Sequence, residues 1–532
     1  MSQTLFGLEL PQLTTEQPPI FTNAASCQKW VAGIASTNAR QAQALLLRQM
    51  NLLNRFEMPA DERFRVLELL REPIYAVHYE CSIRFTARPL PLAPPEQAAF
   101  DTCQALWQAL EIGYLHSLQS FIDNAVAATE ETRKQVALAA VRVLTSLFSS
   151  YLDDCRAAVL PLPNFWHRLH KIYRTLEKLH LTHLTVEDPQ RQQFTTSVAT
   201  IYVETLLLAA ANPLELNPAQ IAQVTYWAKL WSNKVPILPA PPADLRTPPL
   251  GIDISGEEAG MFKANPTTNE NIRWFDMAGV RITVKQTLAA LEKGESPVTL
   301  KLGKDAVQPA CEILLRQVYQ DWCRGGRRAV VKGGAGACQV VVGIEAIHYF
   351  FSGQVFREPN AFPLENDEAA RAAEDAEIAN YTIEDWQELD ENVTDILLKR
   401  ALNQPGKRLA RAQLVAVRTS SNDSLQIGKV QWAAVSGNRD TLLAGIHILP
   451  GPPEAATLHT DGIGSIKAQY CRGFSLPMIE GLGEPASVLT PPAWFQPGHV
   501  IEIKTEYAER KIRLTGRLES GTDFERCTFE EA

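Results

Sequence analysis

The sequence predicts an α+β multidomain protein, in which an all-α N-terminal domain precedes a small α+β unit and one or two β-barrels. Three observations support this fold class. The chain has 532 residues, more than a single hydrophobic core usually organises, so we expect several domains. Apolar residues recur at helical spacing up to about residue 233 and at strand-like spacing later. A proline-rich stretch separates the two patterns.

Residues 1–234 are predicted to form the α-helical domain. Apolar residues within 136–147 follow helical spacing, and proline-containing segments such as 88–95 and 160–164 are expected to interrupt the helices. No stretch approaches the roughly 18 consecutive apolar residues of a membrane span. The first residues lack the basic start and apolar centre of a signal peptide. We therefore expect a cytoplasmic protein with no membrane span.

The small α+β unit is predicted at residues 248–322, after a proline-rich linker at 235–247. A capping-box pattern at Thr283 marks the expected start of its first helix. In order, the expected elements are strands at 250–255 and 271–277, a helix at 283–294, a strand at 298–302 and a helix at about 306–322.

The rest of the chain is predicted to be mostly β, with a barrel at residues 323–454 and a second β-rich domain at 455–532. Short antiparallel strands separated by polar turns are typical of small barrels. The expected strands are 339–351, 413–419, 426–434 and 441–449, then 470–477, 486–489, 499–506 and 511–519. An acidic insertion at 365–391 holds eleven carboxylates and one cation, a composition that predicts a solvated helix or a mobile tether.

The segment 324–337 is the most informative motif. It places Arg324, Arg327, Arg328 and Lys332 in a stretch with five glycines, although the whole chain has a net charge of −9. Guanidinium groups bind phosphates through two hydrogen bonds and stack on bases, and glycines let a ligand approach the backbone closely. We expect these four residues to bind a small anionic ligand, with a nucleotide as the leading hypothesis; a solvated basic loop is the alternative.

The order of a helix, Arg324-x-x-x-Arg328, an apolar strand and a short barrel resembles a PilZ domain, the bacterial receptor domain for cyclic di-GMP. The resemblance covers about residues 317–450. In that family, a second motif, Asp/Asn-x-Ser-x-x-Gly, lies on an early strand. The segment Asn392-Val-Thr394-Asp-Ile-Leu397 resembles it, with Thr for Ser and Leu for Gly.

A second segment, Asp253–Gly260, is an alternative match to this motif and lies upstream of the arginines. It is chemically closer, because it contains Asp253, Ser255 and Gly260.

The resemblance implies an atypical PilZ protein that acts as a non-catalytic bacterial signalling effector. Its ligand would be cyclic di-GMP or a related nucleotide, and no cofactor is implied. Arg324 and Arg328 would clamp phosphate and stack on guanine, while Asn392 and Thr394 would contact a base or a phosphate. The helical domain would offer a surface to a protein partner. A basic run at 399–411 is expected to complete a cationic mouth, which the acidic insertion would occupy when no ligand is bound.

Histidine pairs and a glycine run are the other candidate sites in the sequence. Two His-x-x-His pairs could offer imidazoles to zinc, but they have no nearby cysteine, so we expect ordinary histidines and no metal; the four residues are His167, His170, His180 and His183. The glycine run at 333–336 lacks the Gly-Lys-Ser/Thr ending of a phosphate loop. No sequence motif places a catalytic residue, and we expect no enzyme.

Three alternative functions remain open. The first is a nucleotide-independent protein-interaction scaffold with a degenerate PilZ-like barrel. The second is an enzyme that uses the β-rich half. The third is oligonucleotide binding by the barrels, which the acidic balance and the confinement of basic residues to two runs argue against.

Overall fold

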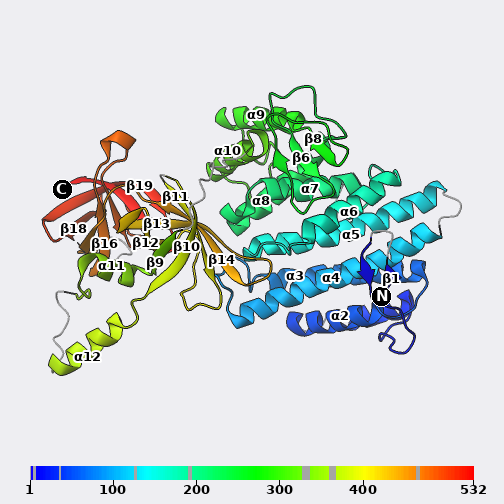
Figure 1. Cartoon of the computed structure of the whole chain (residues 1–532), viewed down its shortest axis with the longest axis horizontal. Helices are drawn as coiled ribbons and strands as arrows, with labels where there is room; N and C mark the ends of the chain where they lie inside the picture. The colour runs from blue at the N-terminus through cyan, green and yellow to red at the C-terminus, as the bar shows by residue number, and fades with distance from the viewer. Residues whose placement is uncertain are drawn as a thin grey trace. The chain divides into compact units, whose positions relative to one another are not determined.

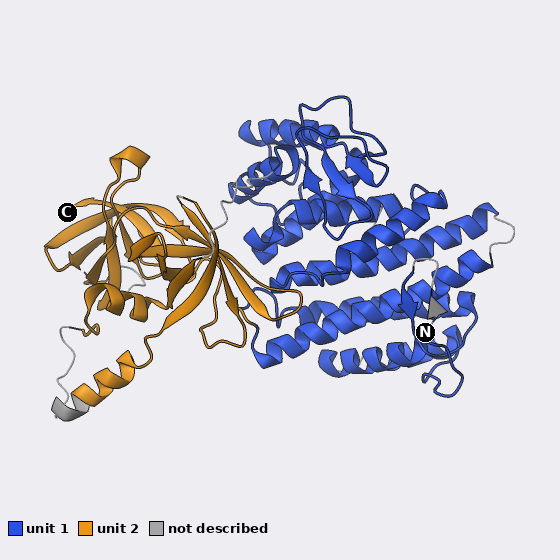
Figure 2. Ribbon diagram, in the orientation of Figure 1, with its two compact units in different colours: residues 1–88, 92–328 blue, residues 89–91, 329–532 orange. Residues whose placement is uncertain are grey.

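The computed structural model describes residues 2–3, 7–34, 38–124, 129–189, 195–325, 336–358, 367–392, 394–462 and 468–532 (Figure 1). The chain forms two compact units (Figure 2). Unit 1 contains residues 1–88 and 92–328, and unit 2 contains residues 89–91 and 329–532. The predicted fold class is confirmed, because helices dominate the N-terminal part, a small α+β part follows, and two closed barrels complete the chain.

The N-terminal part of unit 1 is built from long helices joined by short connections. Helix starts follow local chemistry: Thr129 accepts a hydrogen bond from the Thr132 N–H, and Asn217 forms a capping box with Gln220. The helices are α1 (Ala24–Ile34), α2 (Ala39–Leu53), α3 (Ala60–Ser82), α4 (Pro94–Asp123), α5 (Glu130–Ala157), α6 (Phe165–Lys178), α7 (Val198–Ala210) and α8 (Pro218–Trp231). Short elements lie among them: β1 (Ser2–Gln3), β2 (Glu9–Leu10), β3 (Val186–Glu187), β4 (Thr195–Thr196) and the 3-10 turns η2 (Pro213–Glu215) and η3 (Ser232–Lys234).

Helix α5 is long and apolar enough to cross a membrane by length and composition, but 67% of its most apolar window is buried inside unit 1. It packs against α4 and α7. Its buried cation Arg142 is paired with Glu68 and with Asp188 at 2.9 and 3.0 Å. A buried charge needs such partners because desolvation is costly. We read α5 as the central core helix of unit 1.

The α+β part of unit 1 contains a four-stranded antiparallel sheet in the order β5-β8-β6-β7 and two helices. Its elements are β5 (Ile237–Leu238), β6 (Leu250–Asp253), β7 (Met261–Phe262), β8 (Ile272–Phe275), α9 (Ala278–Glu292) and α10 (Ala310–Cys323). One hydrophobic cluster runs from Leu10 to Cys323, so this part shares its core with the helices.

Three expectations for this region differ from the structure. The proline-rich segment contributes β5, which pairs with β8 at the sheet edge, and both of its flanks lie in unit 1. Helix α9 begins at Ala278 rather than Thr283, because Asp276 accepts a hydrogen bond from the Ala278 N–H. The strand predicted at 298–302 is wrong: these residues form turns, in which Ser296 caps the Thr299 N–H.

The first barrel of unit 2 is closed by six antiparallel strands in the order β10-β11-β14-β13-β12-β9. The strands are β9 (Ala337–Val342), β10 (Ile383–Glu391), β11 (Asp395–Ala401), β12 (Leu414–Thr419), β13 (Asn422–Val435) and β14 (Thr441–Ile448). The short segment 89–91 belongs to the same unit, where Leu90 and Leu409 exchange two backbone hydrogen bonds of 2.7 and 2.8 Å.

The strand predicted at 339–351 is only half right. Strand β9 stops at Val342, and Gly343 has a φ of +99°, a conformation that suits glycine. Helix α11 (Ile344–Ser352) follows. Its residues Ala346 and Ile347 are buried in a cluster with side chains of both barrels, so the apolar run serves two elements.

The acidic insertion is neither a single helix nor a tether throughout. It contains α12 (Asp367–Ile378) and then β10, a strand of the barrel. Along β10, Glu384, Trp386 and Glu388 face inward at every second position. The strand is hidden in the sequence because carboxylates stand at interior positions that usually hold apolar residues.

The second barrel is closed in the order β15-β16-β17-β20-β19-β18. Its strands are β15 (Glu454–Thr460), β16 (Gln469–Leu476), β17 (Ser487–Thr490), β18 (Val500–Lys504), β19 (Glu509–Ser520) and β20 (Glu525–Glu531), with a 3-10 turn, η4 (Glu480–Leu482). Leu458, Val488 and Ile512 lie in its core. The Asp523 carboxylate accepts a hydrogen bond of 3.0 Å from the Leu414 N–H and so links the second barrel to the first.

Candidate ligand-binding site

Arg324 ends helix α10 in unit 1. Its backbone N–H caps the helix by donating to the Gln320 carbonyl at 3.1 Å. The side chain is exposed, and its guanidinium carbon lies 6.0 Å from the centre of the Tyr319 ring. Within the described ranges, no carboxylate forms an ion pair with Arg324. A cation in this setting is attracted by the ring face and still available to an anion.

Two further cations lie around the same helix end, both on α9. The Lys285 ammonium is 5.9 Å from the centre of the Tyr319 ring, so two cations share one aromatic ring. Arg281 is one helical turn before Lys285. Arg281, Lys285 and Arg324 all act electrostatically on the buried Cys323 thiol. We call Arg281, Lys285, Tyr319 and Arg324 the cationic end of α10.

Cys323 itself is no nucleophile in this setting. Burial raises the pKa of its thiol to about 12, against the opposing effect of the three cations. The thiol is therefore neutral near pH 7, and only the thiolate attacks. The cationic end of α10 can bind an anion but offers no activated sulfur.

The other members of the arginine segment, Arg327, Arg328 and Lys332, lie outside the described residues. Their role in ligand binding stays a prediction from the sequence.

Asn392 and Thr394 are brought together in unit 2, in the turn between β10 and β11. The Asn392 side-chain oxygen accepts hydrogen bonds of 2.9 Å from the N–H groups of Thr394 and Asp395. The Asn392 N–H in turn donates to the Asp395 carbonyl at 2.9 Å. The Asn392 side chain is exposed, and its amide NH₂ group can only donate hydrogen bonds.

Asp395 connects this turn to strand β14. It accepts hydrogen bonds from the Thr394 hydroxyl at 2.7 Å and from His447 Nδ1 at 2.9 Å. Burial raises the pKa of Asp395, but the hydrogen bonds from Thr394 and His447 outweigh that effect, and its pKa lies below the ordinary value of 3.8. The carboxylate stays charged near pH 7 and holds the turn in place.

Leu397, which stands where the second motif has glycine, pairs with Gly445 across β11 and β14, and Gly445 pairs with Trp432 on β13. A side-chain carbon on Gly445 would lie 2.4 Å from the indole nitrogen of Trp432, so the absence of a side chain leaves room for that ring. Leu397 and Trp432 are both half-buried. An apolar and an aromatic side chain thus stand beside the Asn392 turn.

Three of the five cations in the basic run 399–411 are engaged inside unit 2 rather than in the predicted cationic mouth. Arg400 is buried and paired with the buried Glu384. The Lys407 ammonium donates to the Val342 carbonyl at 2.9 Å, and Arg408 donates to the Pro89 carbonyl. These three cations stabilise unit 2 itself. Glu384, from the acidic insertion, is a permanent strand partner of Arg400 rather than a displaceable plug.

The histidines of the N-terminal region do not gather into a metal site among the residues that the structure describes. In His170, the two ring nitrogens bond Tyr202 and the Glu258 carbonyl, both at 2.7 Å. Burial lowers its pKa to about 4, so the ring stays neutral and structural.

Sequence reasoning predicted ligand contacts at Arg324, Asn392 and Thr394 but did not include the side chains that surround them in the structure. Arg281 and Lys285 stand four residues apart on a predicted helix, a spacing that could have marked one cationic face. Asp395 directly follows Thr394 and lies within the Asn392–Leu397 motif itself. His447 and Trp432 had no local signal, because only strand pairing brings them to the turn.

These features define a class: a receptor-like chain with exposed, unneutralised cations beside an aromatic ring, a helical unit and a PilZ-like double-barrel unit. Comparison with known proteins narrows it. The family model described as "Cyclic-di-GMP receptor FimW, N-terminal domain" matches residues 25–242, and the "FimW C-terminal beta-barrel domain" model matches residues 458–532. The two models together match more than half of the chain, and the chain belongs to the FimW family of PilZ-like effectors.

One relative extends over nearly the whole chain. The cyclic-di-GMP receptor FimW of Pseudomonas aeruginosa is 22% identical over 574 aligned positions, which cover 94% of this chain and 90% of the relative. No solved structure matches the chain. The cationic end of α10 and the first barrel lie between the segments that the family models match.

Proposed function

We propose that this chain is a non-catalytic signalling effector that binds cyclic di-GMP and passes the signal to a protein partner. The observation that carries the proposal is the cationic end of α10, where Arg324 and Lys285 lie 6.0 and 5.9 Å from the centre of one tyrosine ring. The name of the relative, a cyclic-di-GMP receptor, supports the choice of ligand.

The chemistry of the ligand suits these groups. Cyclic di-GMP carries two phosphates and two flat purines. Guanidinium groups bind phosphate oxygens with charge-assisted hydrogen bonds, and they stack on planar rings. Arg324 and Lys285 would bind a phosphate, with Arg327, Arg328 and Lys332 as further proposed contacts. Because Arg324 and Lys285 are exposed, added salt is expected to weaken binding.

In unit 2, the Asn392 turn is proposed, by itself, as a further place of ligand contact. The exposed Asn392 amide can donate to a phosphate or to the acceptor edge of a base, while the hydrogen bonds of Asn392 and Asp395 hold the turn together. The Thr394 hydroxyl already donates to Asp395, so it would contact the ligand as an acceptor. Leu397 in place of glycine removes one close backbone approach.

Several features favour a binding role over chemistry and a reducing compartment over an oxidising one. The thiol at the site is neutral, as described above. All nine cysteines are free, as in proteins of the cytoplasm, where thiols remain reduced. We therefore propose a cytoplasmic effector in which the helices of unit 1 offer the surface for the partner.

Calorimetric titration of cyclic di-GMP tests the proposal. Wild type should bind, and Arg324→Ala should lose roughly tenfold or more in affinity, because a hydrogen bond to a charged group contributes about 1.5–3 kcal/mol. Lys285→Ala should lose affinity too. Lys293→Ala is the matched control, since Lys293 is exposed at the C-terminal end of the same helix and has no ion pair within the described ranges.

Two outcomes would contradict the proposal. Equal affinity of Arg324→Ala and Lys293→Ala would remove the cationic end of α10 from the site. Failure of the wild-type chain to bind would favour the nucleotide-independent scaffold, to which the leucine at position 397 already points.

A further inference from the structure

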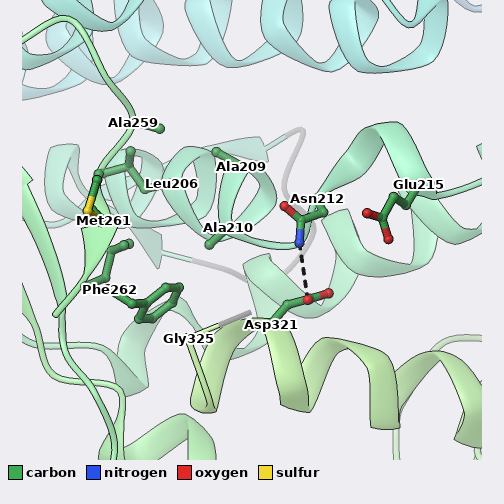
Figure 3. Close-up of a pocket in the computed structure, with 12 residues that line it drawn as sticks. Leu206, Ala209, Ala210, Asn212, Glu215, Ala259, Met261, Phe262, Asp321 and Gly325 are labelled. Atoms are coloured by element: carbon green, nitrogen blue, oxygen red, sulfur yellow. Dashed lines mark hydrogen bonds between the residues drawn. The ribbon is translucent and has the colours of Figure 1, made fainter. Parts of the chain in front are cut away.

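A cavity in unit 1 plays no part in the proposed function. It has a volume of about 230 Å³, and Leu206, Phe262 and Gly325 are part of its wall (Figure 3). On its polar side, the Asn212 amide donates to the Asp321 carboxylate at 3.3 Å. These two polar groups are bonded within the protein, and the volume is below the roughly 300–1,000 Å³ of pockets for drug-sized ligands. The cavity therefore offers a ligand little beyond a small apolar surface.

Helix α3 has an inner face that packs into the core and an outer face that is exposed. On the inner face, Val66, Leu70 and Ile74 belong to the core cluster, and the helix packs against α1, α2 and α4. The outer face carries Tyr79 and the C-cap residue Ile83, which are 76% and 60% exposed. A single exposed apolar residue is ordinary on a protein surface, but Tyr79 and Ile83 stand on successive turns of one helix. They form a small apolar patch.

The exposed residues of the outer face follow the spacing of a helix–helix contact. Glu72, Ala76, Tyr79 and Ile83 are exposed and are separated by four, three and four positions. This alternation keeps side chains in one line along a helix, and it is the spacing by which two helices pack together. The small residue Ala76 leaves room for a larger side chain of the opposite helix. We call these four residues the outer stripe of α3.

The outer stripe has opposite charges at its two ends. Glu72 stands at the N-terminal end. At the other end, the Arg88 guanidinium donates to the Arg84 carbonyl at 3.1 Å and to the Ile83 carbonyl at 3.3 Å, so it lies beside Ile83. Glu72 and Arg88 are both exposed, and neither forms an ion pair within the described ranges. A guanidinium has five N–H donors, so Arg88 can bind a carboxylate as well.

We propose that the outer stripe of α3 is an interface with a second copy of this chain, in which the two α3 helices pack antiparallel. Glu72 of each copy then lies near Arg88 of the other copy. Ala76 of each copy lies opposite Ile83 of the other copy, and the two Tyr79 rings meet near the two-fold axis. A two-fold interface needs a self-complementary patch, because the same residues serve on both sides.

The charges favour both this orientation and this partner. In a parallel pair, Glu72 would face Glu72 and Arg88 would face Arg88, and like charges repel. A different protein would have to supply a base opposite Glu72 and an acid opposite Arg88, whereas a second copy supplies both by symmetry. A contact through one helix of each copy is small beside the roughly 1,200–2,000 Å² of a stable interface, so the dimer is expected to be weak. The contact requires no nucleotide and is independent of the proposed function.

Sedimentation velocity of the full chain without nucleotide, over a wide range of protein concentration, tests this interface. Wild type should form more of a reversible dimer as the concentration rises. The double variant Tyr79→Gln/Ile83→Gln removes the apolar patch, and glutamine keeps a good helix propensity. This variant should weaken self-association by roughly tenfold or more. Ile313→Gln is the matched control, because Ile313 is 63% exposed on α10.

Charge reversal tests the antiparallel pairing itself. Glu72→Arg alone and Arg88→Glu alone should each weaken the dimer, because each change brings like charges together. The two changes in one chain restore opposite charges across the interface, so self-association should return to near the wild-type level. Circular dichroism checks the helix content of each variant.

The outcomes decide the proposal. A wild-type chain that sediments as a monomer at every concentration would overturn it and would leave the outer stripe to a different protein. Dimerisation that survives Tyr79→Gln/Ile83→Gln, or that the double charge reversal does not restore, would overturn it as well. Loss of the dimer in Tyr79→Gln/Ile83→Gln, with Ile313→Gln unchanged and the double charge reversal active, would support the antiparallel contact.

Discussion

The buried pair of Glu384 and Arg400 offers a sharp test of whether the basic run 399–411 is structural. Glu384 and Arg400 are 5% and 3% exposed. One Glu384 oxygen is paired with Arg400, and the other accepts the Lys407 N–H at 2.6 Å. The Arg400 guanidinium also lies 5.1 Å from the centre of the Trp386 ring. The two charges are therefore paired with each other in a buried position.

Removing one partner should be costly. Glu384→Ala leaves Arg400 as a buried charge without its counterion, a change that typically destabilises by about 3–5 kcal/mol. For a unit of about 200 residues, one kcal/mol corresponds to roughly 2–4 °C in the melting temperature. The transition of unit 2 should then fall by about 6–20 °C, as measured by differential scanning calorimetry.

The control is an exposed pair on the second barrel. Arg513 and Glu530 are 3.1 Å apart with side chains 46% and 58% exposed, so Glu530→Ala should cost no more than about 1 kcal/mol. Equal, small effects of Glu384→Ala and Glu530→Ala would refute the structural reading of Arg400. That result would make the basic run a candidate for ligand contact again.

Two further predictions concern carboxylates in unit 2. Burial raises the pKa of Asp523 to about 6. The free energy of unfolding should therefore fall as the pH rises from about 4 to 6, because the unfolded chain releases this proton first. Asp523→Asn keeps an acceptor for the Leu414 N–H and should flatten that part of the stability–pH curve, whereas an unchanged curve would contradict the assignment. The depressed pKa of Asp395 has the opposite effect on stability. Its stabilising contribution is present above the ordinary pKa of about 4 and is lost as the pH falls below that value. In urea unfolding between pH 6 and 3, Asp395→Asn should therefore lose less stability on acidification than wild type.

The helices and most strands were predictable because their apolar side chains recur at the spacing, or in the short runs, that are typical of each element. The apolar spacing in α5 and the short apolar runs of β12 and β14 are visible in the sequence alone. Strand β10 was not, because Glu384 and Glu388 occupy inward positions where apolar residues are expected. The run 339–351 was misread because Gly343 turns the chain between two apolar elements of different period.

The candidate site was only partly predictable for a related reason. Arg324 and the pair of Asn392 and Thr394 lie in short contiguous motifs, which a single sequence can reveal. Lys285 lies near the Tyr319 ring only because α9 packs against α10. Such long-range contacts depend on the tertiary fold and leave no local pattern.

Hydrogen exchange measured by mass spectrometry, with and without saturating cyclic di-GMP, tests whether the dinucleotide binds at the cationic end of α10. Exchange should slow in peptides that span 319–325, and Arg324→Ala should remove this protection. Unchanged exchange at the end of α10, with wild-type chain demonstrably saturated, would show that the dinucleotide binds elsewhere and would contradict the account.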